Sequence, residues 1–191
     1  NNLGKHLESI AIYNQCLALQ SSNARKSVRG MLYAHRGRSK LRIKLWDDAI
    51  KDFEKADILF EAVNFTLGFG YVNFYRGIMY QLNNEYKEAV SEFELAMTNL
   101  KHAQPLMRLQ LQSQYWKSMA HCGEIEEAIK FHHELPFDDY PPHIKAHLHM
   151  NLTEIMLVQG DSKTASELMK GVALYQSQMH QPFTGQFRQQ F

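Results

Sequence analysis

Apolar residues return every three or four positions through most of the chain, which predicts a series of amphipathic helices. The clearest stretch covers residues 71–96, where two such segments flank the sequence Asn-Asn-Glu at 83–85. Two turn-forming residues followed by an acid at a helix start predict a tight turn between helices. Gly77 and Ala89 are small enough for the two helices to approach closely, and we expect Phe93 to fill the space beside them.

The same pattern recurs along the chain at a nearly constant interval. Ala49, Ala89, Ala128 and Ala165 are separated by 40, 39 and 37 residues. A period near 40 with two helices in each unit is typical of a solenoid, in which each helical hairpin packs on its neighbours. The sequence therefore predicts a repeat protein.

These repeats resemble the tetratricopeptide repeat (TPR) superfamily, whose pattern is a small residue and an aromatic on the first helix, then Ala-x3-aromatic-x2-Ala on the second. The best matching unit contains Gly77, Tyr80, Ala89, Phe93 and Ala96. Its interval exceeds the usual 34 residues of the superfamily, as in the longer-repeat members found among bacterial regulatory and signalling proteins. The resemblance implies an all-α, right-handed α-solenoid of TPR-like helical hairpins.

The other units match the pattern to different degrees. The unit before it has Gly37 on the first helix, and its second helix carries Ala49, Phe53 and Ala56. In the third unit His132 replaces the aromatic residue. In the last, Met169 and Val172 replace the aromatic residue and the second alanine.

The period divides the chain into one repeat domain and a tail. We expect a repeat domain over 1–180, with the second helix of a first repeat at 5–20 and four further repeats at about 24–63, 67–102, 106–134 and 143–180. The tail, 181–191, is interpreted as a capping segment or a linker, and its Phe183, Phe187 and Phe191 are spaced by four. We interpret the chain as an excerpt of a longer protein or as a trimmed form of one.

Composition excludes several functional classes. With 45% hydrophobic and 21% charged residues among 191, and a net charge of +1, the chain has no global field for nucleic acid or an anionic membrane. No apolar run approaches the roughly 18 residues of a membrane span. Cys16 and Cys122 lie in different repeats, so we predict free thiols and a cytoplasmic location.

We find no constellation of residues typical of an enzyme. No glycine-rich phosphate loop and no nucleophile elbow is present, so the prediction is a non-enzymatic protein without a cofactor. His143 and His147 are four residues apart, as in some zinc sites, but no glutamate follows the first histidine and no third ligand is evident. They stay weak candidates, and the predicted metal set is empty.

A binding surface remains as the candidate function. Residues 24–44 carry eight lysines and arginines and no acid, and Asp52, Asp57 and Glu61 on the next helix are able to offset part of this charge. The resemblance implies that the first helix of each repeat lines a concave groove. Counting from the alanine–aromatic positions, the groove residues are Arg38, Arg42, Tyr71, Phe74, Ile78, Gln110, Gln114, Lys117, His147 and Asn151.

Such a surface suits a protein or peptide partner with an acidic or carboxylate-bearing segment. The predicted function is thus a peptide-binding scaffold, the interaction or sensory segment of a larger regulatory protein. Two alternatives stay open: a small-molecule or metal-responsive sensor domain, and a self-association module that forms a homo-oligomer. We also consider that Arg38 and Arg42 pair with acids of the same repeat or with solvent.

Overall fold

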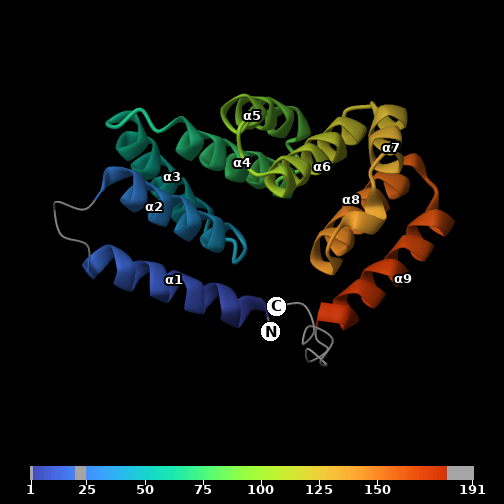
Figure 1. Cartoon of the computed structure of the whole chain (residues 1–191), viewed down its shortest axis with the longest axis horizontal. Coiled ribbons are helices and arrows are strands. Elements are labelled where there is room, and N and C mark those ends of the chain that lie inside the picture. Colours follow the sequence, from blue (N-terminus) through green and yellow to red (C-terminus); the bar gives the residue numbers. More distant parts are fainter. Residues whose placement is uncertain (1, 20–24, 180–191) are drawn as a thin grey trace, which may run out of the picture. The chain divides into compact units, whose positions relative to one another are not determined.

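The computed structural model of the chain describes residues 2–19 and 25–179, and the regular secondary structure of this part consists of helices, without a strand (Figure 1). The tail at 181–191 lies outside it. The α-helices of the described residues are α1 (Asn2–Leu19), α2 (Lys26–Leu41), α3 (Trp46–Glu61), α4 (Thr66–Leu82), α5 (Tyr86–Asn99), α6 (Pro105–His121), α7 (Ile125–His133), α8 (Pro142–Gln159) and α9 (Ser162–Met179). A short 3-10 helix, η1 (Phe137–Asp139), lies between α7 and α8.

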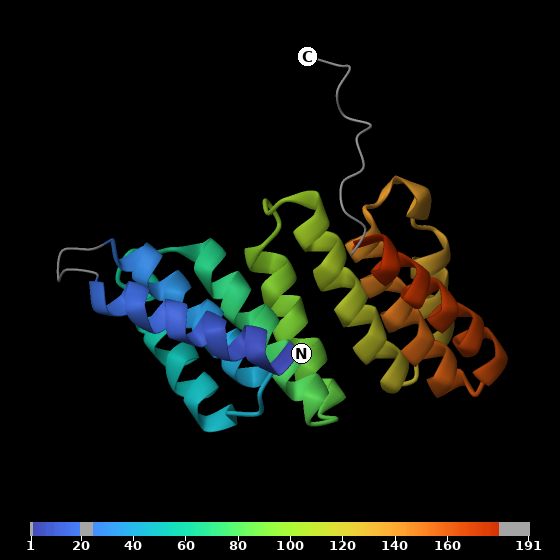
Figure 2. The same cartoon turned by 90° about the horizontal axis from the view of Figure 1, so that it is seen from below.

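The chain divides into two compact units, residues 1–111 and 112–191, with the division inside α6. In the first unit α2 packs against α3 and α4 against α5, and these two hairpins meet through α2, α3 and α4. Helix α1 packs along α2. In the second unit α8 and α9 lie side by side (Figures 1 and 2).

The alanine–aromatic–alanine positions form the centre of the first unit, as the repeat pattern predicts. All six of these side chains are 0% exposed: Ala49, Phe53, Ala56, Ala89, Phe93 and Ala96. A Cβ atom placed on Gly77 would lie 2.4 Å from Cε1 of Phe93, and one on Gly37 would lie 2.6 Å from Cε1 of Phe53. The phenylalanine ring of the second helix therefore occupies the space that a side chain at the glycine of the first helix would need.

The turns inside the hairpins share a residue with positive φ and the same backbone hydrogen bond. Lys44, Asn84, Gly123 and Gly160 have positive φ, at 63°, 62°, 114° and 89°. In each turn the next residue donates its backbone N–H to the carbonyl oxygen five positions earlier, at 2.9–3.0 Å, which satisfies a free carbonyl of the helix end. These four positive-φ residues have the same spacing as the alanines of the repeat pattern, so the turn falls at the same place in each repeat.

Replacing Lys44 with glycine is expected to raise the free energy of unfolding by roughly 0.5–1 kcal/mol. The left-handed region costs a residue with a Cβ about 1–2 kcal/mol, and the greater entropy of unfolded glycine removes part of this gain. Urea unfolding measures the change. Gly123→Ala is the reciprocal control and should destabilise, since its φ is 114°. A Lys44→Gly variant less stable than the parent would contradict the strain at this turn.

Within residues 2–19 and 25–179, no helix combines the length and the apolar character needed to cross a membrane.

Candidate peptide-binding surface

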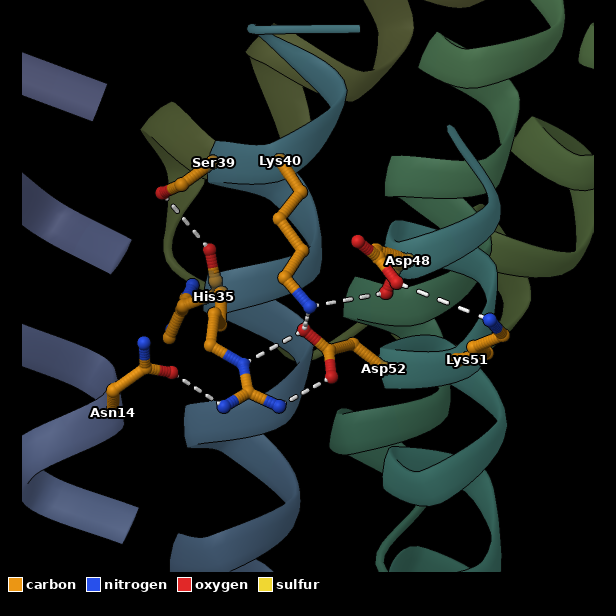
Figure 3. Close-up of polar contacts among 8 residues, drawn as sticks. Asn14, His35, Ser39, Lys40, Asp48, Lys51 and Asp52 are labelled. Atoms are coloured by element: carbon orange, nitrogen blue, oxygen red, sulfur yellow. Dashed lines mark hydrogen bonds and ion pairs between the residues drawn. The ribbon is translucent and has the colours of Figure 1, made fainter. Parts of the chain in front are cut away.

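Four cations at the C-terminal end of α2 and its cap fall into two sets, and the first set is bound to a carboxylate inside the first unit. Arg36 Nη2 and Lys40 Nζ lie 2.6 and 2.9 Å from the carboxylate of Asp52, which is 1% exposed (Figure 3). Arg36 Nη1 also donates to Oδ1 of Asn14 on α1, at 2.6 Å. The hydrogen bond to Asp52 raises the pKa of Arg36. These two cations hold α2 against α3 and α1, so they are structural.

The second set consists of Arg38, in the last turn of α2, and Arg42, the residue directly after the helix. Both side chains are exposed, and neither pairs with a carboxylate among the described residues. Loss of hydration beside neighbouring protein, and then the charge of Arg38, lowers the pKa of Arg42. His6 on α1 also has a lowered pKa, from partial desolvation and then from Arg42 and Arg38. This surface thus carries positive charge that the described part of the chain does not neutralise.

A row of rings from α1, α2 and α4 lies beside this charge. His35 is at the centre, 6.3 Å from Tyr13, 6.1 Å from Tyr71 and 6.0 Å from Tyr75 between ring centroids. The Arg38 guanidinium lies 5.6 Å from the centroid of the Tyr75 ring. Tyr13, His35 and Tyr71 are half-buried, so each residue keeps part of its surface exposed. We call Tyr13, His35, Arg38, Arg42 and Tyr71 the basic–aromatic surface.

Tyr75 supports this row of rings from the buried side. Its side chain is 3% exposed, and its hydroxyl lies 3.1 Å from Nδ1 of His35. Burial raises the pKa of Tyr75 to about 12, so the hydroxyl is protonated at neutral pH. Burial, followed by the charge of Arg38, lowers the pKa of His35, which favours the neutral ring. The charge of the surface therefore comes from its arginines.

The remaining predicted groove residues of the first unit are less accessible. Phe74 and Ile78 are 7% and 8% exposed, and the Phe74 ring packs 6.0 Å from Phe93 and 5.7 Å from Tyr75. Gln110 on α6 is half-buried. Phe74 and Ile78 thus support α4 from within the first unit, and we leave them out of the basic–aromatic surface.

In the second unit, the predicted groove residues join a polar network between α6 and α8. Asn151 Nδ2 donates to Oγ of Ser113 at 2.8 Å, and Gln114 Nε2 lies 3.2 Å from Nε2 of His147. Gln114 and Asn151 are 6% and 4% exposed. Lys117, which is half-buried, lies 3.3 Å from the Glu154 carboxylate. Hydrogen bonds and an ion pair therefore fix α6 against α8.

The two weak metal candidates, His143 and His147, have different surroundings. His143 is exposed on α8, whereas His147 belongs to the polar network of the second unit. Across residues 2–19 and 25–179, no group of three or more histidine, cysteine, aspartate or glutamate side chains is arranged to hold a metal ion.

Several residues of the surface are not evident in the sequence pattern. His35 is not among the groove residues counted from the pattern, and Tyr13 lies on a helix for which the TPR pattern gives no groove position. Tyr75 is next to the predicted Phe74, but it is Tyr75 that contacts His35 and Arg38. Counting along the repeat pattern thus gives Phe74, one residue away from the ring that contacts His35. The packing of α1 adds Tyr13, which the count does not give.

Comparisons with known proteins bear on the fold alone. No model of a known protein family matches the chain. No curated protein sequence matches it either. Among solved structures, it is similar to TPR-like repeats of a Podospora anserina protein described as a kinesin light chain, with a TM-score of 0.58, 16% identity, and coverage of 94% of this chain and 90% of that one. This likeness, together with the helical hairpins of the described residues, shows that the chain has the fold of a TPR-like α-solenoid.

Proposed function

We propose that this chain is a non-enzymatic protein-binding scaffold, and that its basic–aromatic surface holds a peptide segment with carboxylate and apolar side chains. The observation that carries the proposal is the pair Arg38 and Arg42, exposed at the C-terminal end of α2 without a carboxylate partner in the described chain. Arg36 and Lys40 on the same helix share Asp52. The repeat thus gives one set of its cations a carboxylate partner and leaves the other set without one.

The chemistry of the surface defines the partner. Two guanidinium groups one helical turn apart favour a carboxylate, which they bind through charge-assisted hydrogen bonds. The partly open faces of Tyr13, His35 and Tyr71 suit an apolar or aromatic side chain beside that carboxylate. The TPR-like fold supports this role, because such repeats generally bind other proteins through their helical surfaces. We further propose that the chain acts as the interaction segment of a larger regulatory protein.

The test starts from a selection, because the partner is not identified. The full chain is immobilised and a random peptide display library is selected against it. The recovered peptides are then synthesised with a fluorescent label for polarisation measurements. We expect them to be enriched in aspartate or glutamate next to apolar residues. A selected set without acidic residues, or no enrichment at all, would contradict the proposal.

Removing both arginines is expected to weaken the binding of a selected peptide by about tenfold or more, since charge-assisted hydrogen bonds each contribute on the order of 1.5–3 kcal/mol. The variant is Arg38→Ala with Arg42→Ala, compared by fluorescence polarisation with the parent chain. Lys26→Ala is the matched control, as it removes an exposed cation from the same helix. Circular dichroism verifies that both variants are folded. Equal affinity of the double variant and the control would exclude this surface as the binding site.

A further inference from the structure

The third hairpin, α6–α7, departs from the packing of the first two at two matched positions. Where the earlier second helices carry Phe53 and Phe93, α7 carries His132. Seven residues before the positive-φ residue of the turn, the earlier first helices have glycine and α6 has Trp116. The glycines of the first unit leave room for a phenylalanine ring. The third hairpin therefore has the large side chain of Trp116 where that room would be.

Trp116 and Phe131 take over the aromatic packing of this hairpin. Their rings stack with centroids 6.1 Å apart, and Trp116 packs against the core of the second unit. His132 is 6% exposed, and its Nε2 atom is buried without a hydrogen-bond partner among the described residues. A buried polar atom without a partner costs about 1–3 kcal/mol, so this nitrogen needs an explanation.

A pocket of about 250 Å³ lies beside His132, entirely within the second unit. Leucines of α8 and α9 form most of its apolar wall: Leu148, Leu152 and Leu168. Phe137 of η1 closes one side, with its ring stacked 4.5 Å from that of His149. Lys145 Nζ donates to the carbonyl oxygen of Asp138 at 3.0 Å, which fixes the segment that carries Phe137. The pocket is thus built from three helices and a held loop.

The electrostatics of the pocket favour an uncharged occupant. Burial, and then the neighbouring imidazoles beginning with His133, lowers the pKa of His132 to about 4, so the ring is neutral at pH 7. Burial also lowers the pKa of His149. A neutral imidazole nitrogen either donates or accepts a hydrogen bond, according to its tautomer. A hydroxyl group, which also does both, is its natural complement.

We propose that this pocket binds a small, uncharged, largely apolar molecule with one hydroxyl group, and that the hydroxyl pairs with the imidazole of His132. The leucine wall and Phe137 would enclose the apolar body, as in most small-molecule sites. This site is separate from the basic–aromatic surface and does not depend on peptide binding there. It would let the second unit respond to a small ligand.

Phenol and toluene test the proposal, because they have nearly the same size and differ by the hydroxyl. Isothermal titration calorimetry on the full chain should show one saturable phenol site, with at least about tenfold weaker binding of toluene. His132→Phe keeps a buried ring and should remove the preference for phenol. Leu135→Phe, which enlarges a wall residue of the pocket, should weaken both ligands. The control is His143→Ala at an exposed position of α8, which should bind as the parent does.

Each other outcome overturns the proposal. Absence of saturable phenol binding to the parent chain would mean that the imidazole of His132 has no ligand partner in this pocket. Equal affinity for phenol and toluene would mean an apolar cavity without a role for the imidazole. Unchanged phenol binding by both His132→Phe and Leu135→Phe would place the phenol elsewhere. Thermal unfolding followed by circular dichroism verifies that each variant is folded, and the two variants change different parts of the pocket.

Discussion

Replacing Phe93 with alanine is expected to lower the free energy of unfolding by about 3–5 kcal/mol, the largest effect of any single substitution that we consider. The ring is 0% exposed and fills the space over Gly77, where a Cβ would lie 2.4 Å away. It also packs 6.0 Å from Phe74, so its removal leaves a cavity between α4 and α5. Neighbouring hairpins of a solenoid stabilise one another, and the loss should extend through the first unit.

Urea unfolding followed by far-ultraviolet circular dichroism measures this effect. Leu95→Ala is the matched control, since Leu95 lies on the same helix but is 53% exposed. A substitution at such a surface position usually changes stability by less than about 0.5 kcal/mol. If Phe93→Ala and Leu95→Ala cost the same, the alanine–aromatic positions do not form the core of the repeat.

Lowering the pH from 7 to 4 is expected to destabilise the second unit by roughly 3 kcal/mol through His132 alone. Its pKa is about 4 in the folded chain, whereas an unfolded histidine has a pKa near 6.5. Between these values the unfolded chain binds a proton that the folded chain excludes, so stability falls as the pH falls. The lowered pKa of His149 acts in the same direction.

The two tryptophans allow this effect to be assigned to one unit. Trp46 lies in the first unit and Trp116 in the second, so Trp116 fluorescence in a Trp46→Phe background follows the second unit. Urea midpoints are compared at pH 7, 6, 5 and 4 with and without His132→Phe. The variant should show a flatter pH dependence, because carboxylates and His149 contribute equally to both chains. Parallel curves would show that His132 does not carry the effect.

The sequence was sufficient to predict the helical hairpins because their signal is local. The alanine and aromatic spacing places Ala89, Phe93 and Ala96 on one face, and that face is buried. The first helix needs a glycine because the ring of the second helix fills the space beside it. A glycine on one helix and an aromatic residue on the next are directly visible in the sequence. The limits of the repeats and the role of the tail stay predictions.

The charge arrangement of α2 was only partly predictable. Helix periodicity places Arg36 with Lys40 on one face and Arg38 with Arg42 on another. Only the packing of α3 shows that Asp52 meets the first pair. The position of α1 likewise depends on tertiary packing, and it brings Tyr13 to within 6.3 Å of His35. The positive φ of Lys44 was also outside sequence reasoning, because lysine gives no signal for a left-handed turn.

The central claim is that Arg38 and Arg42 bind the carboxylate of a partner peptide, and arginine side-chain NMR tests it most directly. The Nε–Hε signals of ¹⁵N-labelled chain are followed during titration with a selected acidic peptide. We predict that the signals of Arg38 and Arg42 shift with the binding curve, while that of Arg36, already bonded to Asp52, stays in place. A peptide that binds while the signals of Arg38 and Arg42 stay unchanged would contradict the account.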